Sequence, residues 1–379
     1  MILGDLGLNS DLRVGKKKLH IQTSFNEETR IAITEIFEGG RIVDRRESVF
    51  DADISESRFQ KEVKQFHGLV ISDLELLFFV ARQVRASKSI SSITKLGKLF
   101  LQKGFYKEAI EQFLFVQKLE TNSRCCYNEL GQAYFASGDY AAAMENFLQA
   151  IEMNPNYPDL YLYLARAYWK LEKYSLAIIQ LNKAIQLNKE YHIAYYTLGL
   201  YLAESTITSP RDKDLLPPIE RLKEAEHYLR QAVNLSADYN KQLIESGFEK
   251  LANRENVEAA ITDFEDALQK TATQSSKIVA DSEFYLKFLF AGLDHDTKAL
   301  DHYIRTLERS VSQHSDYPDL HHSLGIAYLI KGWHLFVNSM DEFREAVELN
   351  PSFEKARKNL KLLENDGRGF LILLRAILK

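Results

Sequence analysis

The chain has 379 residues, of which 45% are hydrophobic and 27% are charged, and its formal net charge is −5. This is the composition of an ordinary globular protein with enough apolar side chains for a core. The negative balance argues against nucleic acid as a partner, because such binding needs a basic surface. No stretch reaches the roughly 20 apolar residues of a membrane-spanning helix. The two cysteines, Cys125 and Cys126, are adjacent and provide no disulfide framework, and the N-terminus is a poor signal peptide, so the sequence predicts a cytoplasmic protein.

Residues 1–15 predict only an N-terminal tail, and residues 16–86 predict a small α+β module. Three segments of strand length are rich in β-branched and apolar residues, which indicates a three-stranded antiparallel meander. These segments are 18–25, 29–37 and 40–50. Between 57 and 83, apolar residues recur every three or four positions and predict one long helix. Because so small a sheet cannot stand alone, we expect the start of this helix to cover the sheet and its end to contact the part of the chain that follows.

A repeated pattern begins after this module. Leucines followed by a small residue recur at steps of 34 residues: Leu96, Leu130, Leu164 and Leu198. Aromatic, alanine and other apolar positions keep the same step: Phe100, Tyr134 and Tyr168; Tyr106, Tyr140 and Tyr174; Ala109, Ala143 and Ala177; Phe113, Phe147 and Leu181; Val116, Ala150 and Ala184. Within each unit the apolar residues fall twice at helical spacing, separated by a turn at Gly104, Gly138 or Lys173. The sequence therefore predicts helix pairs that stack on one another.

This pattern of leucine, small residue, tyrosine, alanine, phenylalanine, alanine and proline resembles the tetratricopeptide repeat (TPR) family. Unit 124–157 fits best, with Pro155 at the end of its second helix and Tyr127 where many repeats have tryptophan. The resemblance covers about residues 90–364 and implies a mainly α fold, an α-α superhelix of about seven helix pairs with a capping helix after residue 353. The predicted pairs are 90–123, 124–157, 158–191, 192–239 with an insert at 205–219, 240–274, 280–313 and 318–353.

Two segments depart from the regular pattern. Prolines in the insert 205–219 indicate a loop at the turn of the fourth pair. The tail 365–379 ends in an apolar stretch that begins at Phe370 and ends at Lys379. This stretch is too short to span a membrane, and three arrangements are open to it. It packs back on the last repeat, it docks into a partner or another copy of the chain, or it lies on a membrane surface as a peripheral contact.

The sequence contains no residue set that is typical of an enzyme. It has no phosphate-binding glycine loop, no kinase motif and no paired zinc-ligand spacing. The nearest approach to a metal site is a cluster of imidazoles and carboxylates: His314, Asp316, Asp319, His321 and His322. Adjacent histidines on a helix diverge, so this cluster does not offer the converging ligands that zinc needs. We therefore predict no catalytic residue, no metal site and no cofactor.

In a stacked array of helix pairs, the first helix of each pair lines a concave groove, which the resemblance implies is the binding surface. The side chains expected to face a partner there are Asn128, Gln132, Phe135, Asp159, Leu162, Arg166, Trp169, Lys170 and Tyr196. Arg166 and the amides suit a peptide backbone or a carboxylate, while Trp169 and Tyr196 offer flat contact area of the kind that dominates interfaces. Asp159 and Tyr163 occupy places where the TPR domains that bind chaperone C-termini have other residue types, so that specialised role is not expected.

The sequence thus favours a non-enzymatic scaffold or adaptor that binds a peptide or helix of another protein in its groove. The resemblance implies a setting in a larger bacterial-type assembly, such as motility, secretion or envelope machinery. One alternative is a self-assembling subunit of a homo-oligomer that uses the N-terminal module and the C-terminal tail. A more remote alternative is an enzyme whose activity resides in the N-terminal module.

Overall fold

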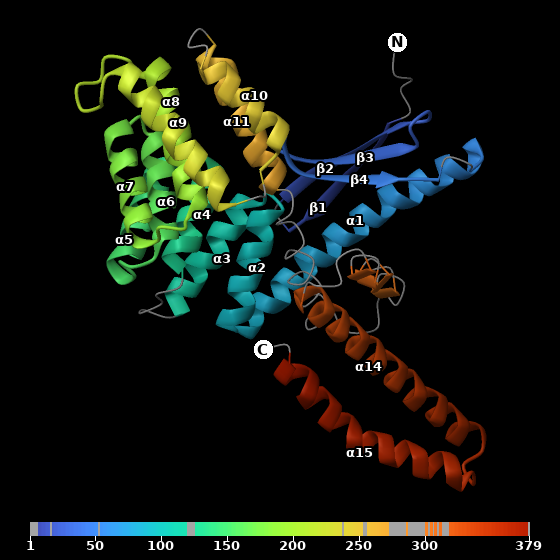
Figure 1. The fold of residues 1–379 in the computed structure, drawn as a ribbon. Helices are drawn as coiled ribbons and strands as arrows, with labels where there is room; N and C mark the ends of the chain where they lie inside the picture. The colour runs from blue at the N-terminus through green and yellow to red at the C-terminus, as the bar shows by residue number, and fades with distance from the viewer. Residues whose placement is uncertain are drawn as a thin grey trace. The chain divides into compact units, whose positions relative to one another are not determined.

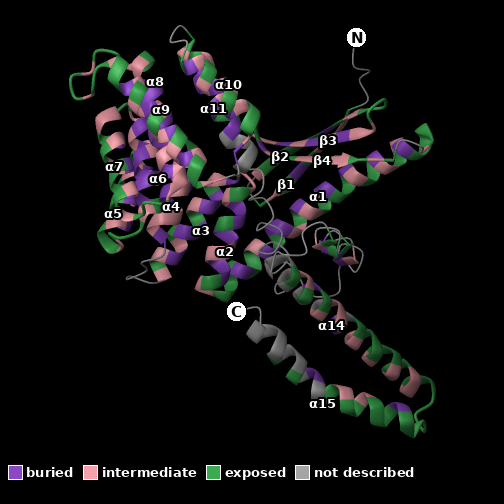
Figure 2. Ribbon diagram, viewed as in Figure 1, coloured by how far each residue is buried: buried purple, intermediate pink, exposed green. Residues whose placement is uncertain are grey.

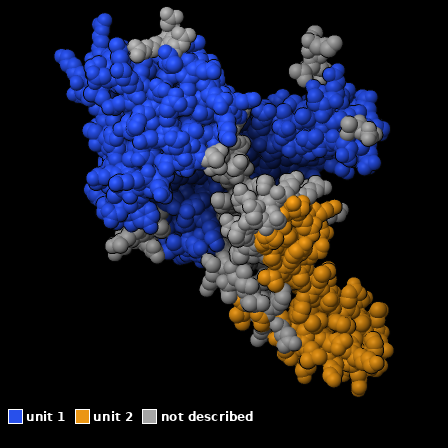
Figure 3. All heavy atoms as spheres, viewed as in Figure 1, with its two compact units in different colours: residues 1–283 blue, residues 284–379 orange. Residues whose placement is uncertain are grey.

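The computed structural model of the chain divides into two compact units, Met1–Glu283 and Phe284–Lys379 (Figure 3). Each unit is described by itself. The described residues are 7–15, 17–51, 54–119, 126–236, 239–252, 256–272 and 318–377, together with the short pieces 286, 300–301, 304–305, 307–308 and 311–312.

The first unit begins with a four-stranded antiparallel sheet in the order β1-β2-β3-β4 (Figure 1). Its strands are β1 (Leu8–Val14), β2 (Lys17–Asn26), β3 (Ile31–Glu38) and β4 (Arg41–Val49). The prediction of three strands is wrong by one, because β1 lies in the segment predicted as a tail. The strand is short, and Leu12, which pairs with Leu19 of β2, is its only fully buried residue. Its alternation of apolar and polar residues is therefore a weak signal.

Helix α1 (Glu56–Ser87) covers one face of this sheet with its first half (Figure 1). Phe59 is fully buried there and meets the ring of Phe25 edge-on, with 5.7 Å between the centroids. The second half of α1 packs against the helix that follows, where the ring centroid of Phe78 lies 5.6 Å from that of Phe100. One helix thereby serves two cores, which agrees with its nearly all-round apolar second half.

A buried polar network joins α1 to three strands. The two ring nitrogens of His67 lie 2.8 Å from the hydroxyl oxygen of Ser10 and 2.7 Å from that of Thr23. The Thr23 hydroxyl also lies 2.7 Å from that of Thr34. Because the site is desolvated, the pKa of His67 is lowered from its ordinary value of 6.5. The fold therefore disfavours protonation of the imidazole.

Residues 90–235 form four antiparallel helix pairs that stack side by side (Figure 1). The pairs are α2 (Ile90–Gln102) with α3 (Tyr106–Leu119), α4 (Cys126–Ser137) with α5 (Tyr140–Met153), α6 (Pro158–Lys170) with α7 (Tyr174–Leu187), and α8 (His192–Thr208) with α9 (Pro218–Leu235). The leucine, alanine and phenylalanine positions that recur every 34 residues are buried in these pairs (Figure 2). The repeat pattern of the sequence therefore marks the core of the array.

A missing side chain sets the distance between the two helices of a pair. A β-carbon on Gly97 would collide with the ring of Phe113, and one on Gly131 would collide with the ring of Phe147. Helices can cross this closely only where one of them has no side chain at the crossing point. The glycine after the repeated leucine is thus required by packing.

The turns between paired helices also repeat. Gly104 and Gly138 have positive φ angles of 74° and 90°, and the third turn has Glu172 at 59°. The sequence placed this third turn residue at Lys173, one position too late. Glu172 is in register with the glycines, although a residue with a side chain costs roughly 1–2 kcal/mol in this conformation.

The insert in the fourth pair forms a loop over residues 209–217, as the sequence predicted, while the ends of the predicted segment 205–219 lengthen α8 and α9. The segment is ordered by Arg221 of α9, which is fully buried. Its Nη1 donates to the carbonyl oxygens of Ser205 at 2.7 Å and Ser209 at 3.2 Å, and its Nη2 donates to that of Pro210 at 3.1 Å. Carbonyl groups at the C-terminal end of a helix lack partners within it, so this arginine caps α8.

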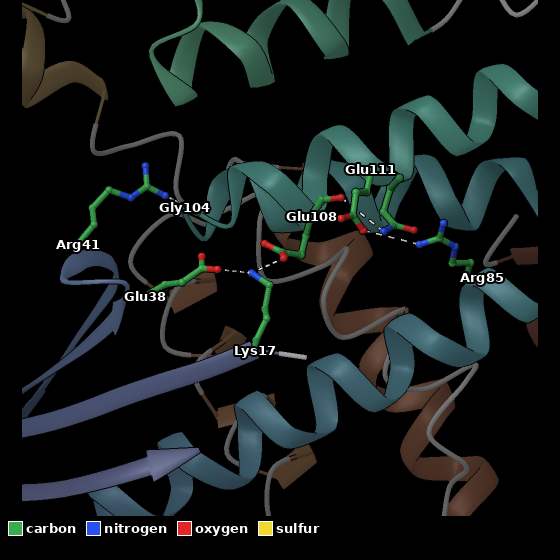
Figure 4. Close-up of polar contacts among 8 residues, drawn as sticks. Lys17, Glu38, Arg41, Arg85, Gly104, Glu108 and Glu111 are labelled. Carbon is green, nitrogen blue, oxygen red and sulfur yellow. Dashed lines mark hydrogen bonds and ion pairs between the residues drawn. The ribbon is translucent and has the colours of Figure 1, made fainter. Parts of the chain in front are cut away.

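Charged side chains join the N-terminal module to the first helix pair (Figure 4). The ammonium of Lys17 lies between the carboxylates of Glu38 on β3 and Glu108 on α3. Burial raises the pKa of the Glu108 carboxyl, and the ammonium of Lys17 opposes that rise. Arg85 of α1 lies 3.8 Å from Glu111 of α3. The sheet and α1 thus both contact α3.

Gly104 lies where the module and the array are closest. Its carbonyl oxygen accepts a hydrogen bond from Nη2 of Arg41 at 3.2 Å (Figure 4). A β-carbon on Gly104 would collide with the carbonyl oxygen of Val43 in β4. At the equivalent Gly138 of the second pair, a β-carbon would meet nothing within 4 Å. The first turn is therefore fitted to the sheet in a way that the second turn is not.

The second unit contains two long antiparallel helices, α14 (Pro318–Leu349) and α15 (Glu354–Ile377). The sequence predicted a helix pair at 318–353, but α14 runs unbroken through Gly332, where that pair would turn. None of the described residues of α14 has the positive φ that separates the helices of the first and second pairs. Without this turn the two predicted helices become one.

The predicted tail 365–379 is not separate from the helix before it, because α15 is continuous as far as Ile377. The side chain of Ile372 in this stretch is 67% exposed. Most of the predicted pair 280–313 lies outside the described residues. In the part of the chain that the structure describes, no helix combines the length and the apolar character needed to cross a membrane.

We predict that the stability of the N-terminal module falls as the pH drops below about 6.5. The folded state holds His67 at a lowered pKa, so the unfolded chain binds the proton more readily and gains from acid. Replacing His67→Gln keeps hydrogen-bonding groups without titration, and should reduce the loss of melting temperature between about pH 7 and pH 5. Thermal unfolding by circular dichroism at both pH values, with His20→Gln as the control for a half-exposed histidine, measures this difference. Equal losses in His67→Gln and the unaltered protein would contradict the prediction.

We also predict that Gly104→Ala destabilises the protein more than Gly138→Ala. Both substitutions put a side chain at positive φ, which costs roughly 1–2 kcal/mol. Only Gly104→Ala also drives a β-carbon into the backbone of β4. Urea unfolding should therefore show an additional loss of at least about 1 kcal/mol for Gly104→Ala, together with faster hydrogen exchange in β4. Equal losses of stability in the two variants would show that the contact between Gly104 and β4 does not stabilise the N-terminal module.

Candidate peptide-binding groove

The residues expected to line the groove come from three first helices of the array. Those on α4 are Asn128, Gln132 and Phe135; those on α6 are Asp159, Leu162, Arg166, Trp169 and Lys170; Tyr196 is on α8. Asp159 and Lys170 are exposed, and Asn128, Gln132, Phe135 and Arg166 are half-buried. Leu162, Trp169 and Tyr196 are buried. The structure therefore divides the predicted set into an accessible part and an enclosed part.

On α4, two amides one helical turn apart are joined. The Nε2 of Gln132 donates to the Oδ1 of Asn128 at 3.1 Å, which leaves further amide donors and acceptors of both side chains for a ligand. Phe135 meets Tyr140 of α5 edge-on, with 5.2 Å between the ring centroids. This part of the groove combines hydrogen-bonding groups with a fixed aromatic edge.

Trp169 belongs to the interior of the array. It is 6% exposed and stacks on Tyr201 of α8, with ring centroids 3.9 Å apart and planes inclined by 8°. Its Nε1 donates to the Oε2 of Glu204 at 3.0 Å. In this structure Trp169 joins α6 to α8 and does not present the flat exposed area expected of it.

Tyr196 is also enclosed by the chain itself. It is fully buried, and its ring stacks on that of Tyr239 with centroids 4.6 Å apart. Its hydroxyl donates to the main-chain carbonyl oxygen of Phe264 at 2.7 Å. Phe264 belongs to α11 (Val257–Ala272), so a helix of the chain covers the groove at α8.

The sequence did not indicate this covering helix. It predicted 240–274 as a fifth pair, with Ala260, Phe264 and Ala267 on the second helix. Val257 and Ile261 widen that apolar face and also pack into the neighbouring core. An apolar face this broad is the signal of a helix that is buried on two sides.

The carboxylates of the groove wall already have partners within the chain. Glu129 lies 3.1 Å from Nζ of Lys98, and Glu204 accepts the indole hydrogen bond of Trp169. The Asp159 carboxylate is hydrogen-bonded to the Tyr191 hydroxyl; burial, followed by this contact, raises the pKa of Tyr191. The carboxylates of Asp159, Glu129 and Glu204 therefore all interact with other residues of the chain.

The positively charged side chains of α6, Arg166 and Lys170, differ from these carboxylates in their contacts. Neither Arg166 nor Lys170 forms an ion pair or hydrogen bond with the residues that the structure describes. The two positions are one helical turn apart, so their side chains lie on the same side of α6. Among the described residues, the accessible wall of α4 and α6 thus offers positive charge without an ion pair beside amide groups, although Lys170 also lowers the pKa of Glu204.

The described residues contain no group of three or more histidine, cysteine, aspartate or glutamate side chains that could hold a metal ion. In the cluster considered from the sequence, His314 and Asp316 lie outside the described residues. Cys125 also lies outside them, and Cys126 is buried. These positions therefore add no chemistry to the described part of the groove.

Comparisons with protein-family models agree with the geometry of these helix pairs. A TPR repeat model matches residues 131–172, and a tetratricopeptide repeat model matches residues 158–191. Residues 131–191 are tetratricopeptide repeats. The TPR segment holds most of α4 and all of α5, α6 and α7, so it contains the accessible groove residues Gln132, Phe135, Asp159, Arg166 and Lys170, whereas Asn128 precedes it. Curated proteins give no match to the chain.

Solved TPR structures resemble about half of the chain or less. The crystal structure of MamA is 21% identical, covers 48% of this chain and 96% of its own, and has a TM-score of 0.35. YrrB, described as a TPR protein with an unusual peptide-binding site, is 20% identical, with 50% and 88% covered and a TM-score of 0.33. The first TPR of Spaghetti (RPAP3), bound to the HSP90 peptide SRMEEVD, is 20% identical, with 32% and 96% covered and a TM-score of 0.30. These likenesses leave the partner of this chain open.

Proposed function

We propose that this protein is a non-enzymatic scaffold that binds an acidic segment of another protein along the first helices α2, α4 and α6. The proposal is supported by the unpaired cations Arg166 and Lys170 beside groove carboxylates that already have partners. A guanidinium and an ammonium on one helical face bind carboxylates by charge-assisted hydrogen bonds. Following the TPR resemblance, we place the protein in a larger assembly of bacterial type.

The amides of α4 give the second element of recognition. Asn128 and Gln132 hold each other by one hydrogen bond, and their remaining donors and acceptors suit the main chain of an extended peptide. Carboxylates of the ligand would then lie at α6 and its backbone at α4.

We predict that the double variant Arg166→Ala, Lys170→Ala loses its partner while its helical content is unchanged. Each charge-assisted hydrogen bond lost costs roughly 1.5–3 kcal/mol, so affinity should fall at least about tenfold. Tagged full-length chains are used for affinity capture, and the affinity of a synthetic segment of the captured protein is then measured. Lys183→Ala with Lys189→Ala, which removes two exposed lysines outside the groove, is the matched control. Equal capture by both double variants would refute the groove proposal.

Self-association is a second candidate, and the second unit provides the observation that favours it. Large apolar side chains on α14 and α15 remain more than half exposed: Leu335 at 59%, Leu349 at 79%, Leu362 at 52% and Ile372 at 67%. Exposed apolar residues in such numbers on one helix hairpin are typical of an interface. A second copy of the chain would bury them.

If the chain self-associates through this hairpin, Leu362→Lys with Ile372→Lys should reduce its mass in light scattering to that of the 43.7 kDa monomer. Charged side chains cannot be buried there without a large desolvation cost. Lys358→Ala with Lys361→Ala changes two exposed residues of the same helix and should leave the mass unaltered. A monomeric mass for the unaltered protein would remove this candidate.

A further inference from the structure

The hairpin of α10 (Lys241–Ala252) and α11 (Val257–Ala272) does not continue the stacking of the array. In the preceding units the second helix of each pair packs extensively on the first helix of the next: α3 on α4, α5 on α6, and α7 on α8. After α9 this rule fails, because α10 barely touches α9 and it is α11 that contacts α8. The hairpin is therefore held to the array mainly through α11.

Helix α11 packs against α8, at the end of the candidate groove. Phe264 meets the ring of Tyr196 edge-on at 6.4 Å and accepts the Tyr196 hydroxyl hydrogen bond on its carbonyl oxygen. Ile261, one turn earlier, is 8% exposed and belongs to the apolar cluster that contains Trp169 and Leu202. An amphipathic helix that lays its apolar face into a hydrophobic groove is a recurrent mode of peptide recognition. Here the helix belongs to the chain itself.

Direct contacts between α10 and α11 also hold the hairpin together. A β-carbon on Gly247 of α10 would collide with the ring of Phe264, which is the same contact that closes the regular pairs. Asp263 of α11 accepts hydrogen bonds at 2.6 Å from both Ser246 and Lys250 of α10. These contacts join α10 directly to α11, while Phe264 also shares one apolar core with Tyr196 and Leu229 of the fourth pair.

The contact between α11 and α8 lacks electrostatic support. Among the described residues, no ion pair links the two helices. Burial raises the pKa of Glu204 on α8, and the carboxylate of Glu265 on α11 adds to this rise, whereas Trp169 and Lys170 lower it. Apolar packing and the hydrogen bond from Tyr196 to Phe264 hold α11 on α8, without an ion pair among the described residues.

We propose that α11 is an internal occupant of the groove, and that an amphipathic helix of a partner protein takes its place on α8. The incoming helix would carry apolar side chains at the spacing of Val257, Ile261 and Phe264, and would offer a main-chain carbonyl to the hydroxyl of Tyr196. This inference rests on the proposed function in using the same groove, but it concerns the wall at α8 and a helix, not the cations of α6.

A labelled peptide of residues 256–272 tests the exchange, because its sequence is that of the native occupant. Fluorescence anisotropy measures its binding to the full-length protein and to Ile261→Asp, whose own α11 carries an unpaired charge where an apolar side chain was buried. Ile261→Asp should bind the peptide at least about tenfold more tightly than the unaltered protein, because its groove is vacated. Thr262→Asp, which adds the same charge at the exposed neighbouring position, should behave like the unaltered protein.

Two further measurements keep the result interpretable. Circular dichroism establishes that Ile261→Asp retains its helical content, and Ile261→Ala serves as the milder variant if it does not. Hydrogen exchange in α8 should rise in the Ile261 variant and fall again when peptide is added. Equal peptide binding by all three proteins, or binding by none of them, would overturn the inference. Indifference of partner capture to Arg166 and Lys170 would instead overturn the proposed function, so either can fail alone.

Discussion

Close packing of a large apolar side chain on a small residue is the contact on which the helix pairs depend, and in the first two pairs it is an aromatic ring on a glycine. Phe113 on Gly97 and Phe147 on Gly131 fix how closely two helices of a pair approach. A pair held in this way still has apolar surface on its flanks, which only another pair can bury. Stacking follows from this, and the groove exists because first helices are stacked beside first helices. The same contact between Gly247 and Phe264 shows that α10 and α11 have the chemistry of a repeat even though they are not stacked like one.

The array could be predicted because its information is local and repeated. Each unit of 34 residues contains its own leucine, its own small residue and its own turn, so no knowledge of distant contacts is needed to recognise a helix pair. Strands β2, β3 and β4 were predictable for a similar reason. Strand β1 was missed because a single buried leucine, Leu12, gives too weak an alternation. The unbroken helix α14 was missed because the letters of a repeat are present there without the turn that divides one.

The candidate site was less predictable, since it depends on contacts between segments far apart in the chain. Position within the repeat correctly assigns Trp169 and Tyr196 to the first helices, but it cannot show that Tyr201 stacks on the one or that α11 covers the other. The sequence also cannot show which charged side chains have a partner within the chain. Arg166 and Asp159 are equally polar in the sequence, yet the structure gives Asp159 a tyrosine hydroxyl and leaves Arg166 without an ion pair among the described residues. What remains available to a ligand is decided by these distant contacts.

The position of α11 also limits the length of the segment that the proposed groove can bind. With α8 covered by α11, the surface proposed to bind a partner consists of α2, α4 and α6. At roughly 10 Å between neighbouring helix axes, this wall measures on the order of 20 Å. An extended chain advances about 3.3 Å per residue, so approximately six residues cross it. A motif of that length arises or disappears through very few substitutions, which allows unrelated proteins to acquire or lose the same docking signal during evolution.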